Sequence, residues 1–146
     1  MNETVKIRKA SCIDALSLFE LNEKFNGSTD ITVEQIESSL IANDREEVFV
    51  AEIDDILVGF CCVQVFKSFC YNVDYAEITE IYIDEEYQHQ SIGTKLLRYV
   101  ELYFEQRGIN NFQLFTGEKN YSAQSFYEKL GYKKTAEIMY RKRKQY

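Results

Sequence analysis

Residues 81–97 (IYIDEEYQHQSIGTKLL) contain residue types that could bind an anionic group, although many α/β proteins begin a helix with Ser-x-Gly-Thr and bind nothing there. Their pattern predicts a strand, a short loop, and a helix that begins at about residues 91–94. A helix N-terminus presents free N–H groups and a partial positive charge, both of which favour a phosphate. Gly93 would let such a ligand approach the backbone closely. The segment has neither a Walker loop nor a G-x-G-x-x-G fingerprint, so it does not support binding of a nucleoside triphosphate or a dinucleotide.

A second motif lies farther along the chain, at residues 120–132 (NYSAQSFYEKLGY). Together, this run and the turn at residues 88–93 (Gln-x-x-Ser-x-Gly) resemble the two signatures of the GCN5-related N-acetyltransferase (GNAT) superfamily. The turn resembles the loop that binds the pyrophosphate of acetyl-CoA, Gln/Arg-x-x-Gly-x-Gly/Ala. The later run resembles the Asn…Ala…Phe-Tyr-x-x-x-Gly-Phe/Tyr helix of that family. The resemblance covers essentially the whole chain, and it implies the GNAT fold and an acetyl-CoA-dependent N-acetyltransferase.

The resemblance also implies how acetyl-CoA is bound, without a metal. Backbone groups at residues 81–83 would pair with the pantetheine arm as if it were an added strand. Backbone amides at residues 88–94 would hold the pyrophosphate, Asn120 would contact the pantetheine, and Phe126 would pack near the cofactor. The expected cofactor-binding residues are Ile81, Tyr82, Ile83, Gln88, His89, Gln90, Ser91, Ile92, Gly93, Thr94, Asn120 and Phe126.

One position departs from the family pattern, because the first glycine of the loop is Ser91 here. If that position needs a positive φ, serine costs about 1 kcal/mol or more. The Ser91 amide is still present, and its hydroxyl could cap the helix or contact a phosphate. We expect a tolerated variant, with weaker cofactor binding or lost activity as the open alternatives.

The resemblance implies catalytic roles for three residues. Direct attack of an amine on a thioester needs a neutral amine, a polarised carbonyl and a proton for the departing thiolate. Tyr127 matches the family's acid, and a phenol is protonated at pH 7. The base is expected to be Glu80, facing the amine, with Glu77 as co-candidate. The alternative that both form ordinary edge or ion-pair contacts stays open, and His89 is expected to face solvent or the phosphates.

Two regions are expected to face the acceptor, since family members often use them: the end of the first helix and the loop before residues 77–84. Their residues are Glu20, Glu23, Phe25, Asn26, Asp74 and Tyr75. The leading hypothesis is direct acetyl transfer to a primary amine of a small cationic acceptor, of the polyamine or aminoglycoside class. The alternatives are a peptide or protein N-terminal acetyltransferase and a non-catalytic acyl-CoA-binding sensor.

Hydrophobic periodicity predicts the elements that position these residues. Strands are expected over residues 5–10, 47–53, 56–66, 77–84, 111–116 and 132–143. Helices are expected over residues 12–25, 32–43, 92–107 and 122–130. The order β-α-α-β-β-β-α-β-α-β predicts an α/β fold in which helices cover the faces of a mixed sheet.

The strand at residues 77–84 has an irregular register. Ile81 and Ile83 share one parity and Ile78 has the other, so strict alternation cannot place all three on one face. A β-bulge near Thr79 and Glu80 would bring them together. A strand buried on both faces is the alternative.

Length and composition favour a single N-acetyltransferase domain over residues 1–146. At 17.2 kDa the chain is too short for two full domains, and its 45% hydrophobic content rules out wholesale disorder. The net charge is −7, although residues 133–144 hold six basic side chains and one acidic one. This acidic body argues against nucleic acid and favours cationic partners, with a merely solvated surface as the simpler interpretation.

Cysteine spacing and hydropathy favour neither a zinc site nor a membrane span. The four cysteines form no C-x-x-C pair and the chain has one histidine, so no zinc spacing is available. The start of the chain has no apolar signal core, and no apolar run approaches the roughly 20 residues of a membrane span. We therefore expect a cytoplasmic protein with a small-molecule amine partner. A homodimer is a further expectation, because dimers are common in the family that the chain resembles.

Overall fold

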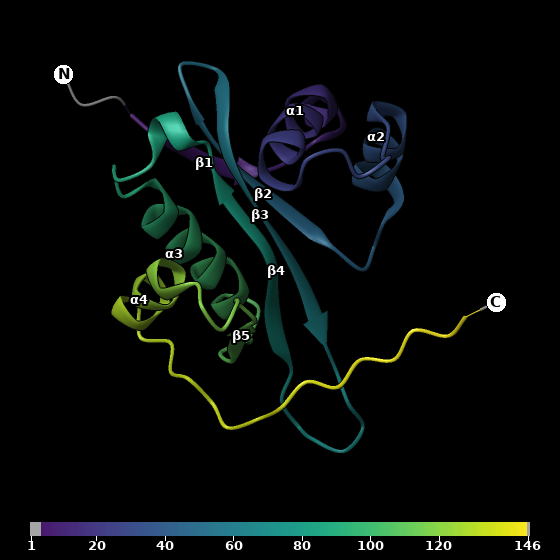
Figure 1. Ribbon diagram of the computed structural model, residues 1–146, viewed down its shortest axis with the longest axis vertical. Helices are drawn as coiled ribbons and strands as arrows, with labels where there is room; N and C mark the ends of the chain where they lie inside the picture. Colours follow the sequence, from purple (N-terminus) through teal and green to yellow (C-terminus); the bar gives the residue numbers. More distant parts are fainter. Residues whose placement is uncertain (1–3, 146) are drawn as a thin grey trace. The chain divides into compact units, whose positions relative to one another are not determined.

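The computed structural model describes residues 4–145, which form two compact units that divide between Phe115 and Thr116 (Figure 1). The first unit contains β1 (Lys6–Lys9), the 3-10 helix η1 (Cys12–Asp14), α1 (Ala15–Asn26), α2 (Val33–Ala42), β2 (Glu47–Ile53), β3 (Ile56–Phe66), β4 (Tyr75–Ile83), the 3-10 helix η2 (Glu85–Tyr87), α3 (Ile92–Glu105) and β5 (Phe112–Leu114). The second unit contains α4 (Tyr121–Lys129).

A five-stranded sheet in the order β1-β2-β3-β4-β5 forms the centre of the first unit. Neighbouring strands are antiparallel, except that β5 runs parallel to β4. Two aspartates, Asp54 and Asp55, make the turn between β2 and β3 with φ values of 50° and 65°. Both positive values suit a tight hairpin turn. The helices and this sheet, with its one parallel pair of strands, confirm the mixed α/β fold expected from the sequence.

The helices of the first unit cover opposite faces of this sheet (Figure 1). On one face, the paired residues Val50 and Phe60 pack with Leu18 and Leu21 of α1. On the other face, Ala51, Ile53 and Val58 pack with Ile92, the first residue of α3. Alternation along β2 and β3 therefore supplies two separate apolar layers, one for each set of helices.

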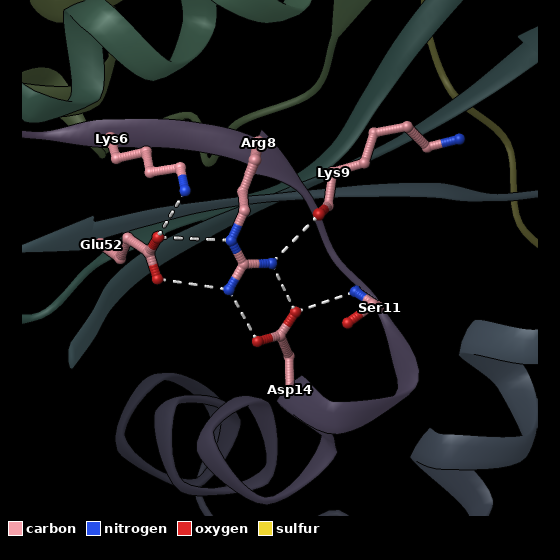
Figure 2. A network of polar contacts seen from close by, with 6 residues as sticks. All are labelled: Lys6, Arg8, Lys9, Ser11, Asp14 and Glu52. Carbon is pink, nitrogen blue, oxygen red and sulfur yellow. Dashed lines mark hydrogen bonds and ion pairs between the residues drawn. The ribbon is translucent and has the colours of Figure 1, made fainter. Parts of the chain in front are cut away.

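A polar network fixes the start of α1 against the sheet edge (Figure 2). The Arg8 guanidinium on β1 donates to both carboxylate oxygens of Asp14, at 2.8 and 2.9 Å, and to Glu52 on β2 at 3.3 and 3.4 Å. The Ser11 N–H donates to the same Asp14 side chain at 2.8 Å. These contacts place the first turn of the helix on β1 and β2.

The expected bulge in β4 is present. Glu80 lies opposite Cys62 and Ile78 lies opposite Val63, so Thr79 is the extra residue of the bulge, and its hydroxyl donates to the Cys62 carbonyl at 3.2 Å. The extra residue reverses the parity of β4. Ile78, Ile81 and Ile83 consequently lie on the α3 face of the sheet, opposite Val63, Cys61 and Gly59 of β3.

The strand predicted over residues 132–143 is wrong. Residues 132–145 contain no strand in the structure, and residues 133–145 are exposed. Alternation alone does not form a strand, because an extended segment needs a hydrogen-bonded neighbour. The four consecutive basic side chains at residues 141–144 also repel one another. β5 is shorter than predicted, at residues Phe112–Leu114.

Candidate active site

The sheet of the first unit opens beside β4. β5 pairs only with Ala76, Glu77 and Ile78, and the bulge at Thr79 follows directly. From Thr79 to Ile83, β3 is the only strand in the described residues that pairs with β4. Apart from the Ile83 carbonyl, which accepts a hydrogen bond from Gln88, the backbone N–H and C=O groups on the other side of this segment have no partner among residues 4–145 and are available to pair with an extended ligand.

Farther along the chain, the start of α3 presents free backbone amides. Ser91 precedes the helix with φ 64° and ψ 16°, a left-handed conformation, and His89 also has a positive φ of 65°. The first helical hydrogen bond runs from the Lys95 N–H to the Ser91 carbonyl at 3.1 Å. The amides of residues 92–94 consequently have no acceptor within the helix. The Ser91 hydroxyl does not cap it.

Side chains in this loop have different roles from their backbone. Ile92 is 2% exposed and belongs to the core below the sheet, so only its amide could reach a ligand. Gln88 donates from Nε2 to the carbonyl of Ile83 at 2.8 Å. This contact fixes the loop to the end of β4, next to the unpaired strand edge. Gln90 is exposed, and Gly93 and Thr94 are half-buried.

An aromatic stack joins α1 to the unpaired segment of β4. The rings of Phe25 and Tyr82 lie 4.9 Å apart between centroids with an interplanar angle of 21°, and Phe60 lies edge-on to Phe25 at 6.1 Å. A residue expected to face the acceptor thus touches one expected to bind the cofactor. Glu20, Glu23 and Asn26 lie on the same helix and are exposed.

The loop before β4 lies away from the unpaired edge at residues 79–83. Tyr75 stacks on Phe66 with a centroid distance of 5.5 Å. It begins β4, seven residues before Tyr82, which corresponds to roughly 20 Å along the strand. Asp74 precedes it directly. These two candidates for acceptor contact therefore lie at the opposite end of the strand from the unpaired edge.

The two candidate bases have different surroundings. The bulge places Glu77 and Glu80 on the same face of β4, opposite Gln64 and Cys62. Glu77 accepts a hydrogen bond from Nε2 of Gln113 on β5 at 2.7 Å. No hydrogen bond or ion pair is found for the Glu80 carboxylate among residues 4–145, and partial burial raises its pKa. Glu80 therefore holds a proton more readily than an exposed glutamate.

Glu46, just before β2, is a residue that the sequence analysis missed. Burial raises the pKa of Glu46, and the charge of Glu80 raises it further. The two carboxylates are therefore near neighbours, with Cys62 between their strands. The signal in the sequence is parity, because Glu46 continues the alternation of Val48 and Val50 on the α1 face.

The second unit carries the remaining predicted residues. The Asn120 side chain accepts from the Ala123 N–H at 3.2 Å and so caps α4. Phe126 and Tyr127 pack edge to face at 5.2 Å, and Tyr127 lies 6.0 Å from the ring of Tyr132. One helix and its cap therefore hold Asn120, Phe126 and Tyr127.

Within the described part of the chain, no group of three or more His, Cys, Asp and Glu side chains is arranged to hold a metal ion. All four cysteines are free thiols. Across residues 4–145, none of the helices combines the length and the apolar character needed to cross a membrane.

Both the sequence and the fold of this chain are similar to those of known proteins. An uncharacterized N-acetyltransferase of Methanocaldococcus jannaschii is 33% identical over 64% of this chain, and the match spans 42% of that protein's length. A spermidine N(1)-acetyltransferase of Thermoplasma acidophilum is 27% identical over 89% of both chains. The solved structure of an aminoglycoside N-acetyltransferase in complex with CoA shares the fold with a TM-score of 0.83, at 13% identity over 99% of this chain and 98% of that one.

The sequence pattern of the acetyltransferase (GNAT) family matches residues 15–132, which is most of the chain. The match runs from the start of α1 through the end of the second motif and includes the loop at residues 88–94. The chain therefore belongs to the GNAT family of acetyltransferases.

Proposed function

We propose that residues 1–146 form one N-acetyltransferase domain, which transfers the acetyl group of acetyl-CoA to a primary amine of a small cationic acceptor. The observation that carries this proposal is the unpaired edge of β4 from Thr79 to Ile83, which is followed, after η2, by the left-handed turn at Ser91 and the free amides of α3. A strand-like arm and an anionic group of one ligand would fit these two features in succession.

Acetyl-CoA supplies a thioester and a pantetheine arm that carries amide groups. The backbone of Ile81, Tyr82 and Ile83 would bind that arm, and the amides around Ser91 would bind the pyrophosphate. The family membership of the chain supports this assignment. The side chain of Asn120 already caps α4, so its proposed contact with the arm would use whichever donor and acceptor positions the cap leaves open.

Glu80 is the proposed base. An amine must lose a proton before it can attack a carbonyl, and a base with a raised pKa accepts that proton more readily than an ordinary carboxylate. Glu77 is already engaged by Gln113, which favours a structural role for it. Tyr127 is the proposed acid, whose phenol would protonate the departing thiolate.

The acceptor is proposed to be a polyamine or an aminoglycoside. Glu46 and Glu80 place two carboxylates on one face of the sheet, where they would attract an ammonium group. The net charge of −7 acts in the same direction over a longer range. The activities named for the spermidine and aminoglycoside relatives support this class.

A thiol-release assay tests the proposal. The chain is incubated with acetyl-CoA and a panel of polyamines, aminoglycosides and short peptides, and free CoA is measured. We expect release with a cationic small molecule and a large loss of turnover, with CoA binding retained, in Tyr127→Phe. Release with peptides alone would favour the N-terminal acetyltransferase. CoA binding without release for any amine would favour a sensor.

A further inference from the structure

The corner that joins β4 to the loop before α3 is unusually acidic for a site proposed to bind a pyrophosphate. Asp84, Glu85 and Glu86 follow β4 without interruption. Glu85 and Glu86 are exposed, whereas Asp84 is 8% exposed. A buried carboxylate close to a phosphate site repels the phosphate unless a cation neutralises it.

Asp84 is the residue around which this corner is built. Its N–H donates to the Val58 carbonyl on β3 at 2.8 Å, and its carbonyl accepts from the Tyr87 N–H at 2.8 Å. Its carboxylate accepts from the Glu86 N–H at 3.3 Å. The same residue therefore terminates β4, starts η2, and sets the direction in which the chain leaves toward Gln88.

Lys24, on the last turn of α1, is the cation that meets this carboxylate. Its Nζ lies 2.7 Å from Oδ2 of Asp84, and the hydrogen bond lowers the pKa of Asp84 and raises that of Lys24. The next residue, Phe25, stacks on Tyr82. Two consecutive side chains of α1 thus contact residues 82 and 84, on either side of Ile83.

We infer that Lys24 is a positioning residue for the CoA pyrophosphate, acting through Asp84. It neutralises the one buried carboxylate at the corner, so that this charge does not repel the bound phosphates. The strand edge at residues 81–83 and the amides of residues 92–94 then serve a single ligand. This inference rests on the proposed binding of acetyl-CoA. Lys24 itself needs no contact with the cofactor.

Repulsion between an unneutralised Asp84 carboxylate and the phosphates predicts a different CoA affinity for each of three variants. Lys24→Met leaves Asp84 unpaired, so CoA binding should weaken roughly threefold to tenfold. Asp84→Asn keeps an oxygen for the Glu86 N–H and removes the repelling charge, so CoA should bind as tightly as to the unaltered chain or more tightly. The double variant Lys24→Met/Asp84→Asn should recover the affinity to within about twofold.

Calorimetric titration of CoA into the full chain measures these affinities, and acetyl-CoA kinetics provide a second readout. The KM for acetyl-CoA should rise in Lys24→Met by the same factor as the dissociation constant, while kcat changes less than about twofold. The deficit should shrink as salt is added, because screening weakens the repulsion. Lys24→Arg keeps the charge and should restore binding.

A matched control is available at Lys9, which pairs with Glu47 at 3.4 Å at the start of β2. Lys9→Met removes one positive charge from the chain without touching the corner, and CoA affinity should stay unchanged. Equal affinity in Lys24→Met and Lys9→Met would overturn the inference. So would a double variant as weak as Lys24→Met, or weaker binding in Asp84→Asn. Absence of CoA binding in the unaltered chain would overturn the proposed function together with the inference.

Discussion

Gly59 offers a direct test of how β4 is held in place. It lies on β3 opposite Ile83, at the end of the unpaired edge. A methyl group built at this position would lie 2.8 Å from the carbonyl oxygen of Tyr82 and 2.5 Å from Cδ1 of Ile83. The Ile83 side chain can rotate away, but the Tyr82 oxygen belongs to the backbone of β4. Gly59→Ala therefore forces the strand itself to move.

The size of the effect follows from these distances. Unstrained contacts of a carbon atom lie at about 3.5–4.0 Å, so the backbone at Tyr82 must shift by roughly half an ångström or more. Overpacking of this kind costs about 1–3 kcal/mol of unfolding free energy. For a chain of this length, that corresponds to a fall in Tm of roughly 3–12 °C. Because the shift falls on the segment proposed to pair with pantetheine, CoA binding should weaken as well.

Urea unfolding and calorimetric titration of CoA measure the two effects separately. Gly117→Ala is the matched control, because a methyl group there meets only Cβ of Asn120, at 3.7 Å. We expect the control to stay within about 0.5 kcal/mol of the unaltered chain. Equal stability of the two variants would refute the packing argument. Lost stability with unchanged CoA affinity would refute the place of Tyr82 and Ile83 in the cofactor site.

Three further substitutions, two of them with a matched control, test other parts of the structure. Ser91→Gly removes left-handed strain of about 1–2 kcal/mol but adds chain entropy of about 0.5–1 kcal/mol, so urea unfolding should show a gain of about 0–1.5 kcal/mol. Arg8→Met leaves two carboxylates facing each other and should lose about 2–3 kcal/mol at pH 7, against less than about 0.5 kcal/mol for the exposed Lys6→Met. The pKa of Asp14 in this network is lowered, chiefly by its hydrogen bond from Arg8. The difference in unfolding free energy between Arg8→Met and the unaltered chain should therefore persist at any pH above the ordinary carboxylate pKa. It should vanish as the pH falls through the lowered pKa of Asp14. Glu80→Gln should cut kcat/KM about 100-fold and abolish the rise of kcat/KM as the pH passes through the raised pKa of Glu80. Glu77→Gln should change kcat/KM less than about threefold. A larger loss in Glu77→Gln than in Glu80→Gln would exchange the roles of the two residues.

Features that depend on local pattern could be predicted from the sequence. The bulge follows from the parity of Ile78 against Ile81 and Ile83, because a strand alternates strictly unless a residue is inserted. The start of α3 follows from Ser91 and the apolar spacing behind it. The sequence also identified Ser91 as a position that would be strained by a positive φ, and the structure has that φ.

Features that depend on a distant partner could not be predicted. Glu46 approaches Glu80 only because β2, β3 and β4 pair in one particular register, and no short-range pattern specifies that register. The hydrogen bond from Gln113 to Glu77 likewise needs the parallel pairing of β4 with β5. The predicted strand at residues 132–143 failed for the same reason, because alternation describes a strand's two faces and says nothing about its neighbours.

The pairing of β4 with its neighbouring strands, and not residue parity, distinguishes Glu80 from Glu77 as the candidate base. Without a bulge, the two residues would lie on opposite faces of β4. With Thr79 inserted, both lie on one face, so orientation alone cannot separate a base from a structural residue. The boundary of β5 separates them instead. Its pairing with β4 ends at Ile78, so Glu77 lies beside Gln113 and is engaged by it, while Glu80 lies beyond the last pair, next to the unpaired edge. A base must be able to exchange its proton with a substrate, and an unpaired carboxylate beside an unpaired strand edge meets that requirement better than one that a neighbouring strand already engages.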